Sequence, residues 1–305
     1  MIKIGLFGYS GSGKTTLFKK LTGKEEETTP FKPVIGKGIF FDSRLKKITE
    51  ILKPKKTVYL EFEFFDIKGF PEGSGFPINY FKNFLNVDLI IYVVGNFKNG
   101  SNPSEQIASL EMELIFSDLE KLEKIIESRK EEKIKGKNFS LEQEKVLEKS
   151  LEILKKEKPL TDLSEQEKKY LEGFELLTTK KTFVFINGKQ KNIEIPLPFI
   201  CEDVFALELE EFYNKIITSI SFIVFFTIKG DIVQAWAIPE GLEAKKAAGK
   251  IHTDIEKGFI KAAVLPYKDF IDIGSWKKAK NMGALKFLGP NSFISNGDIV
   301  EFFYH

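Results

Sequence analysis

The sequence predicts an α/β protein in three parts: a parallel-sheet core, a helical hairpin inserted into that core, and a small β-rich domain at the C-terminal end. Three observations support this prediction. A glycine-rich turn joins a strand to a helix near the N-terminus. Two Lys/Glu-rich stretches with coiled-coil spacing interrupt the apolar strands of the core. After residue 221 the pattern changes to short alternating strands around one helix.

The first element is a phosphate-binding turn. "IKIGLFG" is typical of a buried strand, "TTLFKKLTG" has helical spacing, and "GYSGSGKTT" between them fits G-x-x-x-x-G-K-[ST]. This context predicts a P-loop NTPase and disfavours a chance match. Backbone N–H groups and the helix dipole would hold phosphates, Lys14 would reach the β and γ phosphates as the catalytic charge, and the Thr15 hydroxyl would bind Mg²⁺. The predicted phosphate-binding residues of the turn are Gly8, Gly11, Ser12, Gly13, Lys14, Thr15 and Thr16.

The second strand, "VYLEFEFFDIKGF" from Val58 to Phe70, ends in D-x-x-G. This is the pattern of a GTPase-type site, in which Asp66 would approach Mg²⁺ through water and the Gly69 N–H would meet the γ-phosphate. The alternative is an ordinary turn after a strand. Phe70 stands where many GTPases place a glutamine that orients the attacking water. Any hydrolysis therefore uses another group or is slow.

Two further apolar runs, "LIIYVVG" from Leu89 and "TFVFING" from Thr182, predict buried parallel strands. The second ends in "NGKQ", where a GTPase carries N-K-x-D. The candidate base-binding residues are therefore Asn187, Gly188, Lys189 and Gln190. Because Gln190 is neutral, a guanine preference is not supported, and a turn without base contact is the alternative. "PFICEDVFALELEEF" predicts the final strand and helix of the core.

Between these strands, residues 104–133 and 140–158 are rich in Lys and Glu, with leucine and isoleucine at steps of three and four. "GKNFS" separates the two runs, and Ser140 with Gln143 resembles a capping box. The pattern predicts an antiparallel helical hairpin with a coiled-coil seam. Its charges leave two interpretations open, an arm that contacts a partner and a solvated structural insert.

After residue 221, "FIVFFTIKGDIVQAWAIPEG" alternates, a helical segment follows, and the chain ends in "NGDIVEFFYH". Short strands around one helix predict a small β-grasp domain. We expect an NTPase core at 1–99 plus 179–221, the helical insertion at 100–178 and the third domain at 222–305. A lone histidine such as His252 is more often structural than catalytic. A set of lysines near Phe259 suggests RNA contact, with a solvated lysine face as the alternative: Lys245, Lys246, Lys250, Lys257 and Lys261.

The composition narrows the functional classes. A net charge of +2 over 305 residues gives no global field for nucleic acid, and we expect no DNA partner. Arg44 and Arg129 are the arginines of the chain, so an arginine finger supplied in cis is not expected. Cys201 is the single cysteine, which excludes an intramolecular disulfide. The sequence has no apolar stretch long enough to span a membrane and no signal peptide at its start, so a cytoplasmic protein without a membrane partner is expected.

At this point the residues resemble a known family, the YchF or Obg-like ATPase group of translation-factor-related P-loop NTPases. "FFDSRLKKITEILKPKKTV" resembles the segment after its first switch, and "SLEMELIFSDLEKLEK" the start of its helical domain. "KPLTDLSEQEKKYLEGFELLTTKKTFVFIN" resembles the exit from that domain. "QAWAIPEGLEAKKAAGKIHTDIEKGFIKAAVLPYKDF" resembles its C-terminal TGS domain, and this last match is the most specific.

The resemblance implies a GTPase-like core, an inserted helical arm and a TGS domain of β-grasp type. It also implies a cytoplasmic NTPase that binds Mg²⁺ and ATP or GTP, prefers ATP, and associates with ribosomes. RNA contact through the TGS domain and the helical arm is a separate expectation, which rests on the lysines named above. The chain departs from the family at several positions. Its P-loop carries Gly11, Ser12 and Thr15 where the family usually reads G-x-x-N-V-G-K-S, and Gln190 replaces a glutamate. The first switch is shortened, so Thr28 or Thr29 is the candidate for its Mg²⁺ threonine.

Two functional classes follow. The first is a slow NTPase, with ATP favoured over GTP, that associates with ribosomes. The second is a nucleotide-sensing, ribosome- or RNA-binding module with negligible turnover, in which the nucleotide sets the geometry of the helical arm and the C-terminal domain. A GTP-preferring GTPase is a further alternative because the Gln190 amide can accept a hydrogen bond from adenine or donate one to guanine. Turnover separates the first two classes.

Overall fold

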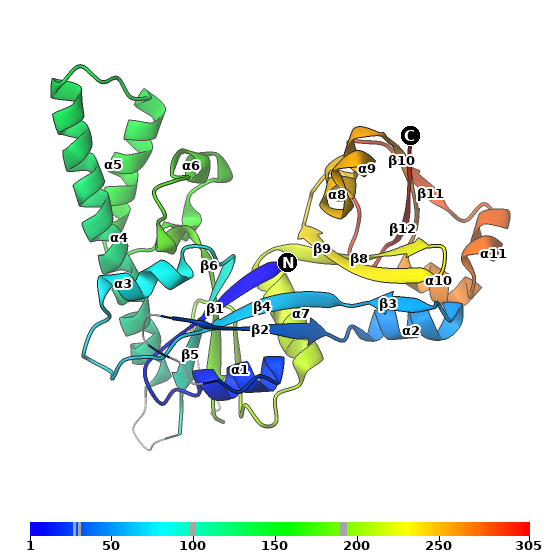
Figure 1. The fold of residues 1–305 in the computed structure, drawn as a ribbon, viewed down its shortest axis with the longest axis horizontal. Coiled ribbons are helices and arrows are strands. Elements are labelled where there is room, and N and C mark those ends of the chain that lie inside the picture. The colour runs from blue at the N-terminus through cyan, green and yellow to red at the C-terminus, as the bar shows by residue number, and fades with distance from the viewer. Residues whose placement is uncertain (27–28, 30–31, 98–101, 190–193) are drawn as a thin grey trace. The chain divides into compact units, whose positions relative to one another are not determined.

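The structure is a computed structural model that describes residues 1–305 except 27–28, 30–31, 98–101 and 190–193 (Figure 1). Its packing divides the chain into two compact units. The first comprises residues 1–38 and 62–207, and the second comprises residues 39–61 and 208–305. The predicted α/β fold, with a P-loop core and a C-terminal domain, is confirmed. The finer division into three domains stays a prediction.

The first unit is built on a six-stranded sheet in the order β2-β4-β1-β5-β6-β7. Strand β1 pairs in parallel with β4 and β5, and β6 pairs in parallel with β5 and β7. The strands are β1 (Ile2–Phe7), β2 (Val34–Phe40), β4 (Leu60–Asp66), β5 (Leu89–Gly95), β6 (Lys181–Asn187) and β7 (Phe199–Glu202). The near-continuous burial of β1, β5 and β6 explains their apolar sequences. Their carboxyl ends meet at one edge, where α/β folds place ligand sites.

Helices and short turns of helix surround this sheet. Helix α1 (Lys14–Thr22) follows β1 directly, and Gly23 ends it in the left-handed conformation. The remaining helical elements of the unit are α3 (Ile78–Phe81), η1 (Lys82–Phe84), α4 (Pro103–Ile134), α5 (Leu141–Lys155), η2 (Leu160–Asp162), α6 (Glu165–Tyr170) and η3 (Leu177–Thr179).

Helices α4 and α5 form the predicted antiparallel hairpin (Figure 1). Lys133 pairs with Glu144 at 2.6 Å and Lys155 pairs with Glu123 at 3.6 Å, so rising numbers on one helix face falling numbers on the other. The seam buries the predicted leucines and continues into the segment that returns to the sheet. Its buried members are Ile115, Leu122, Val146, Leu147, Leu154, Leu160, Leu163, Leu171 and Leu176.

The second unit contains a mixed sheet in the order β11-β10-β12-β8-β9-β3. Its strands are β3 (Lys56–Val58), β8 (Phe222–Lys229), β9 (Ile232–Pro239), β10 (Phe259–Leu265), β11 (Lys286–Leu288) and β12 (Ile299–Tyr304). Its helices are α2 (Ser43–Leu52), α7 (Leu209–Ser219), α8 (Ala244–Ile251), α9 (Thr253–Lys257), α10 (Tyr267–Ile273) and α11 (Trp276–Asn281). Ala244 and Ala247 of α8 belong to the same core as Phe225 and Val300 of the sheet. This is the β-rich C-terminal domain that the sequence predicts.

Residues 39–61 enter the second unit although they precede β4 in the chain. Strand β3 pairs in parallel with β9, with Lys56 opposite Ile232 and Val58 opposite Gln234. The chain thus leaves the first unit after β2, supplies α2 and β3 to the second, and returns with β4. Among the described residues, no helix is both long enough and apolar enough to cross a membrane.

Candidate nucleotide site

The loop between β1 and α1 has the geometry of a phosphate-binding loop. Gly13 caps α1 with a φ of 97°, and a Cβ added there would collide with the Asn187 side chain, so glycine is required. Lys14 is 5% exposed, and its Nζ donates to the carbonyl oxygens of Gly8 and Tyr9, each at 2.8 Å. Its ammonium therefore lies inside the curve of the loop.

Burial sets the protonation of this lysine. Desolvation lowers the pKa of Lys14 to about 8, and the nearby Asp66 carboxylate opposes that shift. Near neutral pH the ammonium is charged. The buried positive charge is therefore compensated by carbonyl dipoles and by Asp66, and a phosphate would supply a stronger partner.

Asp66, the last residue of β4, is fully buried, and neither of its carboxylate oxygens has a well-formed hydrogen bond among the described residues. Desolvation raises its pKa, while the Thr15 hydroxyl, Lys14 and the Ile67 N–H act from close by to lower it. These three groups therefore lie close to the Asp66 carboxylate, although none forms a hydrogen bond of good geometry with it. Two unsatisfied buried carboxylate oxygens beside a hydroxyl form a hard-oxygen donor set that fits Mg²⁺.

The segment after β4, residues 67–77, lies directly against the phosphate-binding loop; we call it the Gly69 loop. The Ser10 N–H donates to the Phe70 carbonyl oxygen at 2.8 Å. A Cβ added to Gly69 would lie 2.5 Å from the Gly8 carbonyl oxygen and 2.5 Å from Lys14 Nζ, which no real side chain tolerates. The Gly69 loop thus occupies the Ser10 N–H and the space beside Lys14 Nζ.

Asn187 connects the end of β6 with the phosphate-binding loop. Its Nδ2 donates to the Ser12 carbonyl oxygen at 3.4 Å, and its Oδ1 accepts the Val204 N–H at 3.1 Å. Gly188 follows with a φ of 139°, in a conformation that side chains disfavour. The structure brings the predicted Asn187 next to the phosphate-binding loop, whereas a Cβ added to Gly188 would meet the Asn96 backbone. Lys189 is exposed, and Gln190 lies outside the described residues.

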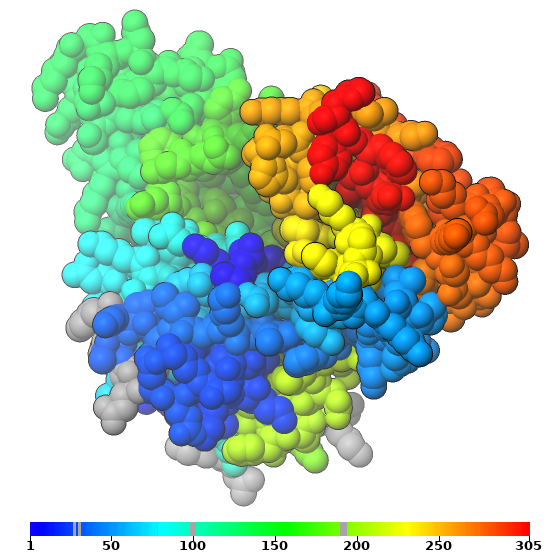
Figure 2. Space-filling view, turned by 45° about the vertical axis from the view of Figure 1, so that its right-hand side comes forward, coloured from blue at the N-terminus to red at the C-terminus, as the bar shows by residue number. Residues whose placement is uncertain are grey.

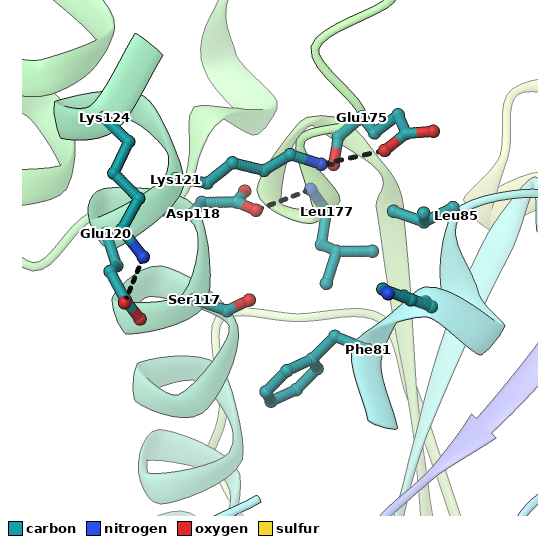
Figure 3. A pocket seen from close by; sticks show the side chains of 10 residues that line it. Phe81, Leu85, Ser117, Asp118, Glu120, Lys121, Lys124, Glu175 and Leu177 are labelled. Carbon is teal, nitrogen blue, oxygen red and sulfur yellow. Dashed lines mark hydrogen bonds and ion pairs between the residues drawn. The ribbon is translucent and has the colours of Figure 1, made fainter. Parts of the chain in front are cut away.

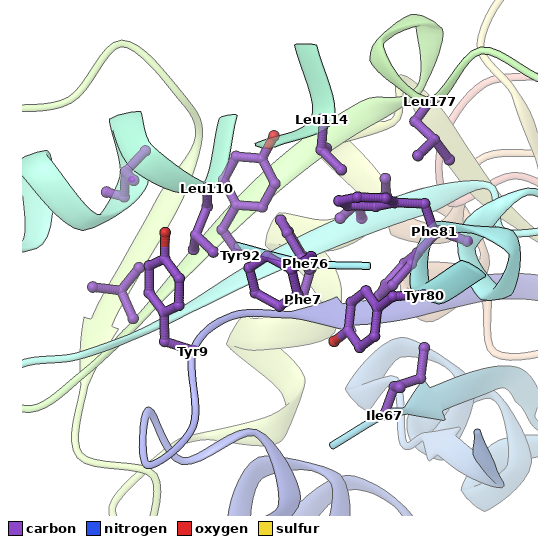
Figure 4. Close-up of a cluster of buried hydrophobic side chains, with 14 of the residues drawn as sticks. Phe7, Tyr9, Ile67, Phe76, Tyr80, Phe81, Tyr92, Leu110, Leu114 and Leu177 are labelled. Atoms are coloured by element: carbon purple, nitrogen blue, oxygen red, sulfur yellow. The ribbon is translucent and has the colours of Figure 1, made fainter. Parts of the chain in front are cut away.

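An aromatic cluster joins the Gly69 loop to the base of the hairpin (Figure 4). Tyr9 stacks on Phe76 with centroids 5.6 Å apart, and its hydroxyl lies 2.6 Å from the Ser109 hydroxyl oxygen on α4. Phe70 packs edge-on against Phe76 and Tyr80 at 5.7 and 5.6 Å. Phe70 therefore anchors the Gly69 loop in a core and is not aimed at a water molecule. The sequence showed that Phe70 replaces a glutamine, but not this packing.

Two pockets of the first unit differ in character. One of about 130 Å³ lies at the rim of the phosphate-binding loop, lined by Tyr9, Ser10, Glu72, Phe97 and Gln106 among others. A larger one of about 430 Å³ lies between η1, α4 and the return segment, with Phe81, Leu85 and Leu177 facing it (Figure 3). The smaller pocket is the one that includes the backbone of the predicted phosphate-binding turn.

The side chains of Thr29 and Arg129 have partners outside the phosphate-binding loop. The Thr29 hydroxyl accepts the Lys32 N–H at 3.2 Å, and Thr28 lies outside the described residues. The Arg129 guanidinium lies 4.5 and 5.0 Å from the Phe139 and Phe174 ring centroids in the hairpin, so it serves the structure there.

Two other polar side chains also have local structural contacts. Arg44 donates to Asp42 at 2.6 Å within the second unit. His252 Nδ1 accepts the Asp254 N–H at 3.1 Å and caps α9, which agrees with a structural role.

Family models match most of the chain. Residues 3–133 match a model described as 50S ribosome-binding GTPase. Residues 222–304 match the model YchF-GTPase_C, described as a protein of unknown function (DUF933).

Curated relatives span the full chain. A protein of Buchnera aphidicola from Acyrthosiphon pisum, named "Ribosome-binding ATPase YchF", is 32% identical over 99% of both chains. Proteins of the same name from Escherichia coli O157:H7 and Bacillus subtilis are 31% and 28% identical over 99% and 98% of each chain. Among solved structures, the Schizosaccharomyces pombe YchF GTPase has a TM-score of 0.81 at 23% identity, covering 99% of this chain and 97% of that one. A GTP-binding protein of Pyrococcus horikoshii has a TM-score of 0.58 at 13% identity, covering 100% of both chains. These last two likenesses concern the fold.

Proposed function

The chain belongs to the YchF family, and from this premise we propose that it binds a nucleoside triphosphate with Mg²⁺, hydrolyses it slowly, and associates with ribosomes. ATP is the favoured nucleotide, because curated relatives are named ribosome-binding ATPases and "NGKQ" lacks the aspartate that reads guanine. The buried Lys14 is the single observation that carries the proposal, since a charged lysine enclosed by a glycine-rich loop is suited to a phosphate.

Different residues of the site bind the phosphates and Mg²⁺. Backbone N–H groups from Gly8 to Thr16 hold the phosphates, and Lys14 offsets the charge that develops on the transferred phosphoryl group. Thr15 and, through water, Asp66 would hold Mg²⁺, which supplies charge neutralisation to the β and γ oxygens when bound. The Gly69 N–H would bind the γ-phosphate. The Thr29 hydroxyl, which hydrogen-bonds to the Lys32 backbone, would have to leave Lys32 to join them.

A terminal phosphate has to replace the Phe70 carbonyl at the Ser10 N–H. We propose that this competition makes the Gly69 loop responsive to the nucleotide, and that the aromatic cluster transmits its movement to α4. The hairpin and the C-terminal domain, which resembles a TGS domain, would then contact the ribosome, including its RNA. The cytoplasm is the compartment that this role requires.

A nucleotide-sensing module with negligible turnover is the second candidate. The packing of Phe70 in an aromatic cluster favours it, because the side chain at the position of the usual glutamine is apolar and held in a core. In that case the nucleotide would change the geometry of the hairpin without being consumed at an appreciable rate.

One experiment separates the candidates. The purified protein is titrated with fluorescent ATP and GTP analogues in Mg²⁺, and steady-state phosphate release is measured on the same samples with Lys14→Ala as the control. We expect tighter ATP binding and a turnover that falls roughly 10²-fold in Lys14→Ala. Full turnover in Lys14→Ala would refute the NTPase assignment. Binding without turnover would favour the sensing module, and tighter GTP binding would reverse the base preference.

A further inference from the structure

The C-terminal sheet has one covered face and one partly open face. Helices α8 and α9 lie on one side of β10 and β12, and α11 lies on the other (Figure 1). Ala262 and Val264 of β10 belong to the core under α8. Since strand side chains alternate, Lys261 and Ala263 point to the opposite face. In the space-filling view the red C-terminal strand lies at the surface between orange segments (Figure 2).

Two phenylalanines accompany Lys261 on this open face. Phe303 of β12 stands opposite Lys261, and Phe287 of β11 stands opposite Ala263. The Lys261 Nζ lies 4.2 Å from the Phe287 ring centroid and 5.6 Å from that of Phe303. Phe287 remains 58% exposed although it is a large apolar side chain. We call Lys261, Phe287 and Phe303 the Phe287 surface.

A carboxylate and a group of lysines lie near the Phe287 surface, since Glu301 stands opposite Ala263 as Phe287 does. Glu301, the acidic residue of strands β10, β11 and β12, accepts a hydrogen bond from Trp276 Nε1 at 3.1 Å. This bond places α11 beside the Phe287 surface. The helix directs Trp276 and the buried Ala279 inward, and its lysines are exposed. These lysines are Lys277, Lys278 and Lys280.

The structure separates this surface from the lysines that the sequence grouped with Phe259. Lys245, Lys246 and Lys250 lie on α8, over the covered face of the sheet. Phe259 packs on Phe302 at 6.2 Å against the core under α8, so its ring is not free for a ligand. Of that lysine set, Lys261 is the one paired with accessible aromatic rings.

We propose that the Phe287 surface binds unpaired bases of single-stranded RNA. Aromatic rings on a flat sheet accept the planar face of any base, and neighbouring lysines attract the phosphates. A base would replace the Lys261 ammonium over Phe287, and the ammonium would move to a phosphate. The lysines of α11 favour this anionic partner over a protein surface. The proposal rests on the proposed ribosome association and assigns RNA recognition to particular residues.

The test uses the full chain and a labelled single-stranded RNA oligonucleotide of about 12 nucleotides, with binding followed by fluorescence anisotropy. Phe287→Ala should weaken binding about fivefold or more, because one stacked base contributes about 1 kcal/mol or more. Phe293→Ala is the matched control, since Phe287 and Phe293 are each 58% exposed and Phe293 is bridged to Glu243 near α8. Thermal melting checks that both variants fold.

Two further arms test stacking against charge. A duplex RNA of the same length hides its base faces, so Phe287→Ala should not weaken its binding. Lys261→Gln should reduce the slope of log affinity against log salt by roughly one unit, because a phosphate contact is lost. Equal weakening of duplex and single strand by Phe287→Ala would overturn the stacking role.

Ribosome co-sedimentation and phosphate release are measured on the same variants. Phosphate release should be unchanged in Phe287→Ala, whereas Lys14→Ala should retain oligonucleotide binding, so the two proposals fail independently. The absence of oligonucleotide binding in the wild type, or equal binding by wild type and Phe287→Ala, would overturn the inference. Lost ribosome binding with unchanged RNA binding in Phe287→Ala would also overturn it and indicate a protein partner.

Discussion

Lys14 donates hydrogen bonds to two carbonyl oxygens of its own loop, and a phosphate oxygen has to compete with both. The lysine is nevertheless poised for an anion, because burial lowers the pKa of its ammonium and an anionic ligand would raise that pKa again. The motif "GSGKTT" was sufficient to predict this lysine and its position at the start of a helix. The two carbonyl partners and the lowered pKa depend on how the loop folds back, which no local pattern shows.

The lowered pKa of Lys14, about 8, gives a pH dependence with a definite sign. At pH 7 the ammonium is already charged, so ADP binding takes up no proton there. At pH 9 the free protein holds mostly the neutral amine, and binding should take up nearly one proton, so affinity falls as pH rises above 8. Calorimetry in EDTA, in two buffers of different ionisation enthalpy, measures the uptake. Lys14→Arg, which stays charged, should show none, and equal uptake in both proteins at pH 9 would exclude Lys14 as the source.

Gly69 carries a second prediction at this scale. A Cβ at this position would lie 2.5 Å from the Gly8 carbonyl oxygen and 2.9 Å from the Ser10 nitrogen. In Gly69→Ala the Gly69 loop must move away from the phosphate-binding loop, and phosphate release should fall roughly 10²-fold through misplacement alone. Gly289→Ala is the control, because nothing lies within 4 Å of its added Cβ and its φ is not left-handed. Wild-type turnover in Gly69→Ala would show that this close contact has no role in hydrolysis.

At the scale of elements, the hairpin was predictable because its leucine spacing and its Lys/Glu surface act locally. The N-terminal caps of α5 and α6 were predicted less completely. Ser140 accepts the Gln143 N–H at 3.4 Å, whereas the Gln143 side chain bonds Tyr170 and Arg129 and does not return to Ser140. A complete capping box forms instead at Ser164 and Glu167, at the start of α6. The Gln143 side chain is held by tertiary partners, so only the second of these two similar sequences forms a complete capping box.

The attachment of α4 to the segment leading into β6 depends on Asp118, which is 1% exposed. Its carboxylate accepts the N–H groups of Leu177 and Thr178 at 2.9 and 2.7 Å and the Thr178 hydroxyl at 2.7 Å. Asp118→Ala leaves three buried donors unsatisfied and should lower the free energy of unfolding by about 3 kcal/mol.

Denaturant unfolding monitored by circular dichroism measures this loss. Glu127→Ala, at an exposed position of the same helix, is the control and should change the free energy of unfolding by less than about 0.5 kcal/mol. A stability change in Asp118→Ala as small as that of the control would show that the three hydrogen bonds do not hold this junction.

At the scale of the whole molecule, each unit has a core of its own. The aromatic cluster and the hairpin seam belong to the first unit, and the α8 core belongs to the second. The sequence predicted both sheets from their strand patterns. It did not predict that residues 39–61 pack with the second unit, because β3 is only three residues long and its partner β9 lies far along the chain.

Separate cores predict two thermal transitions in calorimetry. ATP with Mg²⁺ at about 100 times its Kd should stabilise the first unit by about 2.7 kcal/mol and move only its transition upward. The Lys14→Ala protein at the same ATP concentration should show little shift. If both transitions rose together by the same amount in the wild type, the units would be energetically coupled and nucleotide binding would be sensed throughout the molecule.

Because residues 39–61 pack in the second unit, the protein cannot complete that unit early during its synthesis on the ribosome. During translation β3 emerges early, yet its partner β9 appears only after the whole hairpin and β6 and β7 have been made. At about 5–20 residues per second, β3 waits on the order of ten seconds or more without its partner. Helix α2 and β3 must stay free to pack with the second unit while the strands before and after them form the first sheet. Nascent chains halted before β9 should therefore expose residues 39–61 to proteases, and completion of synthesis should protect them.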